Sequence, residues 1–243
     1  MTRWLLALLV LAGLPGFASA AGGGAAYEHA NINLSNQASL QRGARNFVNY
    51  CMGCHSAQYV RYNRLAEDIG LSEDQMVTNL MWAAEKPHET MEIAMPGSDA
   101  ERWFGVTPPD LSLIARARGK DYLYTFLKGF YLDDTRPAGV NNIALPGASM
   151  PHVLWELQGL RRAQIETDAE GHEVISGYET VVEGQLTEEE YDSFVLDLVN
   201  FLVYIAEPVK LERERLGVWV IFFLLVFLLM SYLLKQEYWK DVR

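Results

Sequence analysis

Hydrophobic residues recur at helical spacing in two segments, one near the start of the chain and one near its end. The first stripe follows Ser39, a suitable N-cap. Its members are Leu40, Ala44, Phe47, Val48 and Cys51. The second stripe follows Thr187, which can form a capping box with Glu190. Its members before Pro208 are Tyr191, Phe194, Val195, Leu198, Leu202 and Ile205. We expect two helices that pack on each other through these stripes.

The region between these helices carries weaker signals. Pro109 and Asp110 can open a helix, whose one side carries Leu111, Ile114, Ala115 and Arg118. Short β-branched runs at 174–175 and 180–182, on either side of Gly177, predict a small hairpin. The expected fold class is therefore mainly α, with long loops.

Two apolar runs lie at the ends of the chain. Residues 1–20 contain Arg3, an apolar stretch and the sequence Ala18-Ser19-Ala20, which is typical of a secretory signal peptide. An uncleaved anchor helix fits less well because the apolar stretch is short. Residues 216–234 are 19 residues without a charge, enough to cross about 30 Å of hydrocarbon. Because this run is apolar on every side, it predicts a transmembrane helix rather than a buried core helix.

These runs divide the chain into four parts. We expect a signal peptide at 1–20, a periplasmic domain at 21–215, a transmembrane helix at 216–234 and a cytoplasmic tail at 235–243. Three Lys or Arg residues lie close to each end of the span, so the positive-inside rule does not decide its orientation. The signal peptide decides it, and the expected location is a bacterial inner membrane.

Composition and charge narrow the function. Half of the 243 residues are hydrophobic, which excludes disorder as the dominant state. The 20 Lys and Arg residues against 31 Asp and Glu residues give a net charge of -11, which argues against nucleic acid as a partner. Ten acidic residues and no Lys or Arg occupy 166–192. This stretch can steer a basic protein, or it can simply keep an exported domain soluble.

The two cysteines belong to one motif, Cys51-Met52-Gly53-Cys54-His55. C-x-x-C-H is the attachment pattern of a c-type haem, because two sulfurs three residues apart reach both vinyl groups and the histidine follows beneath the iron. A thioredoxin-like pair would need a βαβ context, and a zinc site would need two further ligands. The motif therefore predicts one covalent haem c, with His55 as the proximal ligand.

The opposite face of the iron needs a sixth ligand or stays open. Candidates after the motif are His88, His152, His172, Met76, Met81, Met91, Met95 and Met150. A single methionine is more often a core filler than a ligand. Met95 and Met150 stand out because each precedes a proline in loop-like sequence, and spacing alone does not choose between them.

Three segments resemble the cytochrome c1 family, the haem subunit of the quinol:cytochrome c oxidoreductase or respiratory complex III. They are RNFVNYCMGCHS at 45–56, PPDLS with IARAR at 108–118, and AEP at 206–208 before a single membrane span. The resemblance runs from about Asn31 to the C-terminus. It implies a c-type cytochrome domain held by a C-terminal anchor.

The resemblance also implies roles for individual residues. Cys51 and Cys54 form the thioethers, His55 and Met150 ligate the iron, and Arg118 holds a haem propionate. Met150 is followed by one proline where the family often has several, so Met95 is the alternative. Either Pro108 or Pro109 can offer a backbone carbonyl to the second ring nitrogen of His55.

The implied function is electron transfer from the Rieske iron-sulfur protein to a soluble or tethered cytochrome c, with quinol oxidation in cytochrome b. With both axial positions filled, no independent catalytic site is expected on this chain. Two other functions stay open. One is a membrane-tethered cytochrome that serves another oxidase or reductase, and the other is a haem enzyme or gas sensor with an open distal site.

Overall fold

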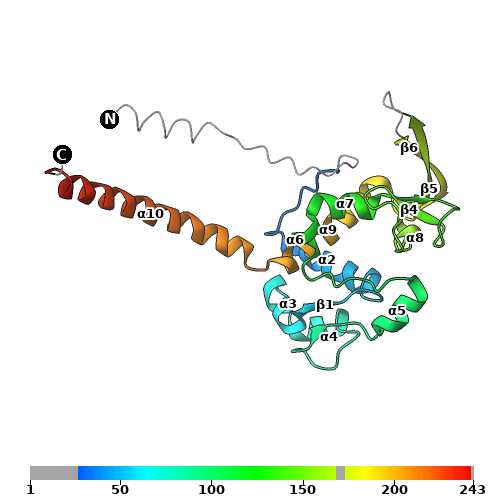
Figure 1. Cartoon of the computed structure of the whole chain (residues 1–243). Helices are drawn as coiled ribbons and strands as arrows, with labels where there is room; N and C mark the ends of the chain where they lie inside the picture. The colour runs from blue at the N-terminus through cyan, green and yellow to red at the C-terminus, as the bar shows by residue number, and fades with distance from the viewer. Residues whose placement is uncertain (1–26, 168–172, 242–243) are drawn as a thin grey trace.

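The computed structural model describes residues 27–167 and 173–241, so the predicted signal peptide lies outside the described residues. The first half contains α2 (Gln37–Tyr50), β1 (Ala57–Arg61), α3 (Tyr62–Ile69), α4 (Glu73–Asn79), β2 (Thr90–Met91), α5 (Gly97–Phe104), α6 (Ile114–Arg118) and α7 (Lys120–Lys128). The second half contains β3 (Phe130–Leu132), β4 (Val140–Asn142), α8 (Trp155–Gln158), β5 (Gly159–Thr167), β6 (Glu173–Glu183), α9 (Glu188–Ala206) and α10 (Lys210–Tyr238). Three two-stranded antiparallel ribbons accompany the helices (Figure 1). The prediction of a mainly α fold is confirmed.

Helices α2 and α9 cross at the centre of the domain, as their apolar stripes predicted. The crossing is close at Gly43, where a Cβ atom would lie 2.2 Å from the Asp197 carbonyl oxygen and 2.6 Å from the Phe201 Cβ. Beside this contact the rings of Phe47 and Phe201 pack with centroids 5.5 Å apart, and both side chains are fully buried. The two helices therefore share one core, and residues far apart in the sequence hold it together.

The start of α2 differs from the prediction that Ser39 is its N-cap. The helix begins at Gln37, and the side chain of Asn36 caps it by accepting from the Ser39 N–H at 3.1 Å. Asn caps a helix as well as Ser does. Ser39 lies inside the helix, buried, and its hydroxyl donates to the Asp197 carboxylate on α9 at 2.6 Å. The Ser39 hydroxyl thus joins the two helices instead of capping one.

The capping box of α9 is confirmed. The Thr187 hydroxyl accepts from the Glu190 N–H at 3.3 Å, and the Glu190 carboxylate accepts from the Thr187 N–H at 2.9 Å. The helix ends at Ala206, before the predicted stop at Pro208. Both ends of α9 could therefore be predicted from the local sequence.

The predicted helix opening at Pro109 and Asp110 is wrong. Helix α6 begins at Ile114 and has five residues. The Asp110 carboxylate accepts from the Ser112 N–H at 2.8 Å and from the Gln58 N–H at 2.9 Å. The Asp110 carboxylate therefore stabilises a local turn and joins this turn to β1. It does not cap a helix.

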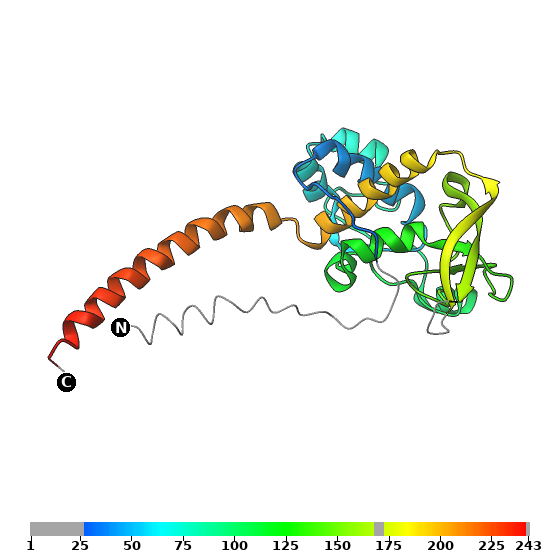
Figure 2. The ribbon, with the colours of Figure 1, turned by 90° about the horizontal axis from the view of Figure 1, so that it is seen from above.

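The hairpin prediction is also wrong in its pairing. The runs 174–175 and 180–182 both lie on β6, and the partner strand is β5. Gly177 is not a turn residue, because it pairs with Gln164 next to a register shift between Gln164 and Ile165. Figure 2 shows this hairpin as a long ribbon at the edge of the domain, away from α10.

Helix α10 contains the predicted span 216–234 and extends beyond it at both ends. It is long and apolar enough to cross a membrane, with a mean hydropathy of 2.6 in its most apolar window, and none of its described residues is buried in the domain. Residues 207–209 connect it to α9, and the Arg213 guanidinium bonds the Glu207 carboxylate at 2.6 Å across this connection. Figure 1 shows α10 leading away from the domain.

Candidate haem site

The C-x-x-C-H motif begins where α2 ends. Cys51 is the C-cap of the helix, and its N–H donates to the Phe47 carbonyl at 2.9 Å. The N–H groups of Cys54 and His55 then both donate to the Cys51 carbonyl, at 3.0 and 2.9 Å. This tight turn holds the two sulfurs and the imidazole within one segment of five residues, as attachment to a haem edge requires.

The pKa of the Cys51 thiol helps to decide whether this motif can hold a zinc ion. Burial, and to a lesser degree the neighbouring Cys54, raises the pKa of the Cys51 thiol to about 12. A zinc site needs thiolates and further ligands. Within residues 27–167 and 173–241 no group of three or more His, Cys, Asp or Glu side chains is arranged to hold a metal ion. The described residues around the motif therefore do not supply the ligands of a zinc centre.

His55 is oriented by the loop before α6. Its Nδ1 lies 2.8 Å from the backbone oxygen of Pro109. A carbonyl can only accept, so Nδ1 carries the proton and the lone pair of Nε2 is free for the iron. Of the two carbonyls that the sequence offered, the structure thus selects Pro109. Burial lowers the pKa of His55, although the Pro109 bond and Asp110 partly oppose it, and the neutral ring is the form that ligates a metal.

The segment around Ser56 fastens this loop to the motif. The Ser56 carbonyl accepts from the Leu111 N–H at 2.8 Å, and the Ser56 hydroxyl accepts from the Ile93 N–H at 3.1 Å. The Ser112 hydroxyl accepts from the Tyr59 N–H at 3.1 Å. The run PPDLS therefore supplies the Pro109 carbonyl that bonds the His55 ring, and its other residues hold this carbonyl in place. The contribution of Ser56 could not be predicted from local sequence, because its partners Leu111 and Ile93 lie tens of residues away.

The candidates for the sixth ligand differ in burial. Met76 and Met91 are fully buried core residues, and His88 is exposed. His172 lies outside the described residues. Met95 and Met150 are both half-buried in irregular segments, so the two methionines that the sequence singled out stay open. In Figure 1, α5 after Met95 and α8 after Met150 both lie on the side of the domain where α2 ends.

The loop that carries Met150 is held at both ends. At its start, the Gly147 N–H donates to the Asn141 side chain and the Arg136 guanidinium donates to the Gly147 carbonyl, both at 2.8 Å. At its end, the buried ring of His152 stacks on Phe130 with centroids 4.9 Å apart and planes 8° apart. Burial, helped by the positive charge of Arg161, lowers the pKa of His152 to about 4. This histidine is therefore a neutral packed ring.

Arg118, the predicted propionate partner, is the last residue of α6. Its side chain is exposed, and its guanidinium lies 5.5 Å from the centre of the Tyr122 ring. It forms no ion pair within the part of the chain that the structure describes. The cation is thus available to bind a carboxylate.

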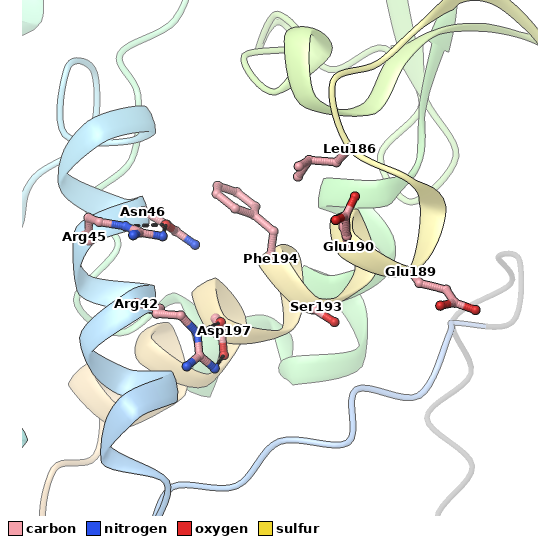
Figure 3. Close-up of a pocket in the computed structure, with 9 residues that line it drawn as sticks. All are labelled: Arg42, Arg45, Asn46, Leu186, Glu189, Glu190, Ser193, Phe194 and Asp197. Carbon is pink, nitrogen blue, oxygen red and sulfur yellow. Dashed lines mark hydrogen bonds and ion pairs between the residues drawn. The ribbon is translucent and has the colours of Figure 1, made fainter.

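A cavity of about 450 Å³ lies elsewhere, between α2 and the start of α9 (Figure 3). Arg42 and Asp197 face each other in it as an ion pair of 2.5 Å. None of the predicted site residues lines this cavity. It is a groove beside the crossing of the two core helices and not part of the haem site.

The fold and the site define a class of protein, a c-type cytochrome with one covalent haem and an apolar helix after its domain. The model of the cytochrome C1 family matches residues 28–242, and the chain belongs to this family. Cytochrome c1 of Allochromatium vinosum is 52% identical over 244 residues, and the match covers 100% of both chains. The ammonia monooxygenase gamma subunit of Nitrosomonas europaea is 45% identical, with 100% of this chain and 99% of the relative covered. A solved chain of a hyperthermophilic respiratory complex III covers 99% of this chain at 17% identity with a TM-score of 0.47, too distant a likeness to bear on function.

Family membership confirms three predictions from the sequence. The protein is a haem electron-transfer subunit of the cytochrome bc1 type, its cofactor is one covalently bound c-type haem, and α10 anchors it in a membrane.

Proposed function

We propose that the chain takes single electrons from a Rieske iron-sulfur protein and delivers them to a soluble or tethered cytochrome c, in a complex with cytochrome b. The observation that carries this proposal is the neutral His55, fixed by Pro109 at the end of a C-x-x-C turn. Such a ring is prepared to ligate iron and not to exchange protons. The 52% identity with a cytochrome c1 over the full chain supports the choice of partners.

Five residues hold the haem in this proposal. Cys51 and Cys54 would supply the sulfurs for the thioethers, and Nε2 of His55 would be one ligand of the iron. The Met150 sulfur would be the other, and Arg118 would bind a propionate. When bound, a haem with His and Met ligands supplies a one-electron change of charge and has no free coordination site for oxygen or peroxide. The chain's own task is then to keep the ligands fixed while the charge changes.

The axial assignment is tested with two matched methionine variants. We expect Met150→Leu to lose the methionine-to-iron charge-transfer band of the ferric protein and to bind carbon monoxide when reduced, because one face of the iron opens. Met95→Leu should keep the band and exclude carbon monoxide. Absorption spectra of the purified full-length proteins measure both. The reverse pattern would transfer the sixth ligand to Met95, and carbon monoxide binding to the unaltered protein would favour an enzyme or sensor.

The partners are tested by purifying the intact complex from membranes. We expect cytochrome b and a Rieske subunit to copurify with the tagged chain. The name of the Nitrosomonas relative favours a second candidate, a tethered cytochrome that serves a monooxygenase. Copurification with monooxygenase subunits, and without cytochrome b, would establish that function instead.

The location is part of the proposal. The predicted signal peptide supports a haem domain in the periplasm, with α10 crossing the inner membrane and residues 235–243 in the cytoplasm. Protease added to intact spheroplasts should remove the haem domain and spare a C-terminal tag. Digestion of the tag alone would indicate the opposite orientation in the membrane.

A further inference from the structure

We propose that His152 is a positioning residue for the sixth ligand, holding Met150 against the iron through its ring stack on Phe130. The inference rests on the proposed ligation by Met150. Phe130 is 2% exposed and packs edge-on against Phe126 of α7, with centroids 5.3 Å apart. His152 is itself 7% exposed. The end of the Met150 loop is thus tied through two aromatic contacts to a helix of the core.

The chain between His152 and Met150 is short and stiff. Pro151 alone separates them, and its ring fixes one of the two backbone torsions at that residue. A shift of the His152 ring is therefore passed to the Met150 backbone. On the other side, Gly147 is held by Asn141 and Arg136, and the buried Ala148 donates its N–H to the Leu145 carbonyl at 3.1 Å. Without the stack, the next fixed point on this side would be the buried Leu154, two residues beyond His152, and Met150 would be held less closely.

The flat face of His152 carries this contact. Its Nε2 is buried and makes no hydrogen bond of ordinary geometry within the described residues, although the Gln158 side chain and the Gly159 backbone partly oppose the fall in the pKa of the ring. A phenylalanine can reproduce the stack but not the chemistry of a histidine. A role in packing therefore predicts that His152→Phe behaves like the natural protein and His152→Ala does not.

The experiment compares four variants of the full-length haem-loaded protein in detergent. We expect His152→Ala to lose most of the methionine-to-iron charge-transfer band and to bind carbon monoxide in the reduced form. His152→Phe should keep the band and exclude carbon monoxide. Phe130→Leu, which removes the stacking partner but keeps an apolar side chain, should lose the band as His152→Ala does. The exposed His88→Ala serves as the control and should change neither signal.

The outcomes separate the inference from the function beneath it. If His152→Ala and Phe130→Leu keep the band while Met150→Leu loses it, Met150 is the ligand and the positioning role is refuted. If Met150→Leu keeps the band, the ligation fails and the inference fails with it. Should His152→Ala yield no folded protein, Phe130→Leu still decides, because a retained band there overturns the proposal.

Discussion

At the scale of single residues, Asp121 ties the first described part of the chain to α7. Its carboxylate accepts from the Ala30 N–H at 2.8 Å and lies 3.3 Å from the Lys120 ammonium and 3.4 Å from His29. Lys120 also donates to the Ala30 carbonyl. Partial burial by itself would raise the pKa of Asp121, but the Ala30 bond and Lys120 together bring it below its usual value. The ionised carboxylate is the form that holds the segment.

This predicts a stability difference that depends on pH. A pKa that is lower in the folded than in the unfolded chain stabilises the fold above the ordinary value of 3.8, and the contribution disappears as the pH falls through the folded value. We expect Asp121→Asn to lower the free energy of unfolding by about 1 kcal/mol at neutral pH, because the pair is partly screened by solvent. Urea unfolding at neutral and acidic pH measures this. The exposed Asp134→Asn is the control, and an equal loss at both pH values would contradict the prediction.

Residue chemistry was predictable where the partners are neighbours in sequence. Cys51, Cys54 and His55 lie in a single turn, so local spacing is enough to predict that they belong to one site. The carbonyl of Pro109 was also foreseeable as one of two candidates, because a ligating histidine needs an acceptor at its other nitrogen. The clamps at Arg136 and His152 were not foreseeable, since each depends on a fold that brings distant segments together.

At the scale of elements, the crossing of α2 and α9 depends on the absence of a side chain at Gly43. Helix propensity alone predicts that Gly43→Ala gains about 1 kcal/mol. The contact predicts the opposite sign, because the new Cβ would meet a backbone oxygen and the Phe201 Cβ, neither of which can move without shifting α9. We expect a net loss of about 1–3 kcal/mol in the free energy of unfolding.

Chemical denaturation of the purified protein measures this effect. Gly97→Ala at the start of α5 is the matched control, because its Cβ would lie 3.5 Å from Thr107, an ordinary contact. It should leave the stability within about 0.5 kcal/mol of the natural protein. Equal stability of Gly43→Ala and Gly97→Ala would show that the two helices can separate without cost.

The long helices were predicted well and the short elements were not. Helix α9 has an apolar stripe over several turns and a capping box, so its period and its ends agree. Helix α6 has five residues, too few for a period to appear, and the Pro109–Asp110 signal belongs to a turn. The sequence pattern predicts two short strands around Gly177, where the structure has the single strand β6. The partner strand β5 carries polar residues and shows no strand signal in the sequence.

At the scale of the whole molecule, folding changes the acidic stretch 166–192. Glu190 belongs to the capping box, and Asp192 pairs with the Lys128 ammonium at 2.8 Å. The strand register also places Arg162 opposite Glu179. The exposed acidic residues of this stretch that the structure describes are Glu166, Glu179, Glu183, Glu188, Glu189 and Glu190. This remaining surface is negative, but less so than the sequence alone suggested.

The remaining charge predicts electrostatic steering of a basic cytochrome c. We expect the rate of electron delivery to fall several-fold as ionic strength rises from about 0.02 to 0.2 M, because salt screens the attraction between the two proteins. Stopped-flow oxidation of the reduced protein measures this rate.

A charge-neutralised variant tests the location of the docking surface. Glu188→Gln with Glu189→Gln should lower the rate at low salt and reduce its dependence on salt. Glu73→Gln with Asp74→Asn, also exposed but on α4, should leave both unchanged. A rate that does not respond to salt in the natural protein would remove this surface from the mechanism.

The link between α9 and α10 is three residues, which span about 10 Å when fully extended. It is braced by the pair of Glu207 and Arg213 and follows directly on a helix that packs against the C-x-x-C-H helix. The short, braced link therefore limits how far the haem-binding domain can move relative to its membrane helix. For the proposed electron transfer, the donor and the acceptor would then have to cover most of the distance to this domain themselves.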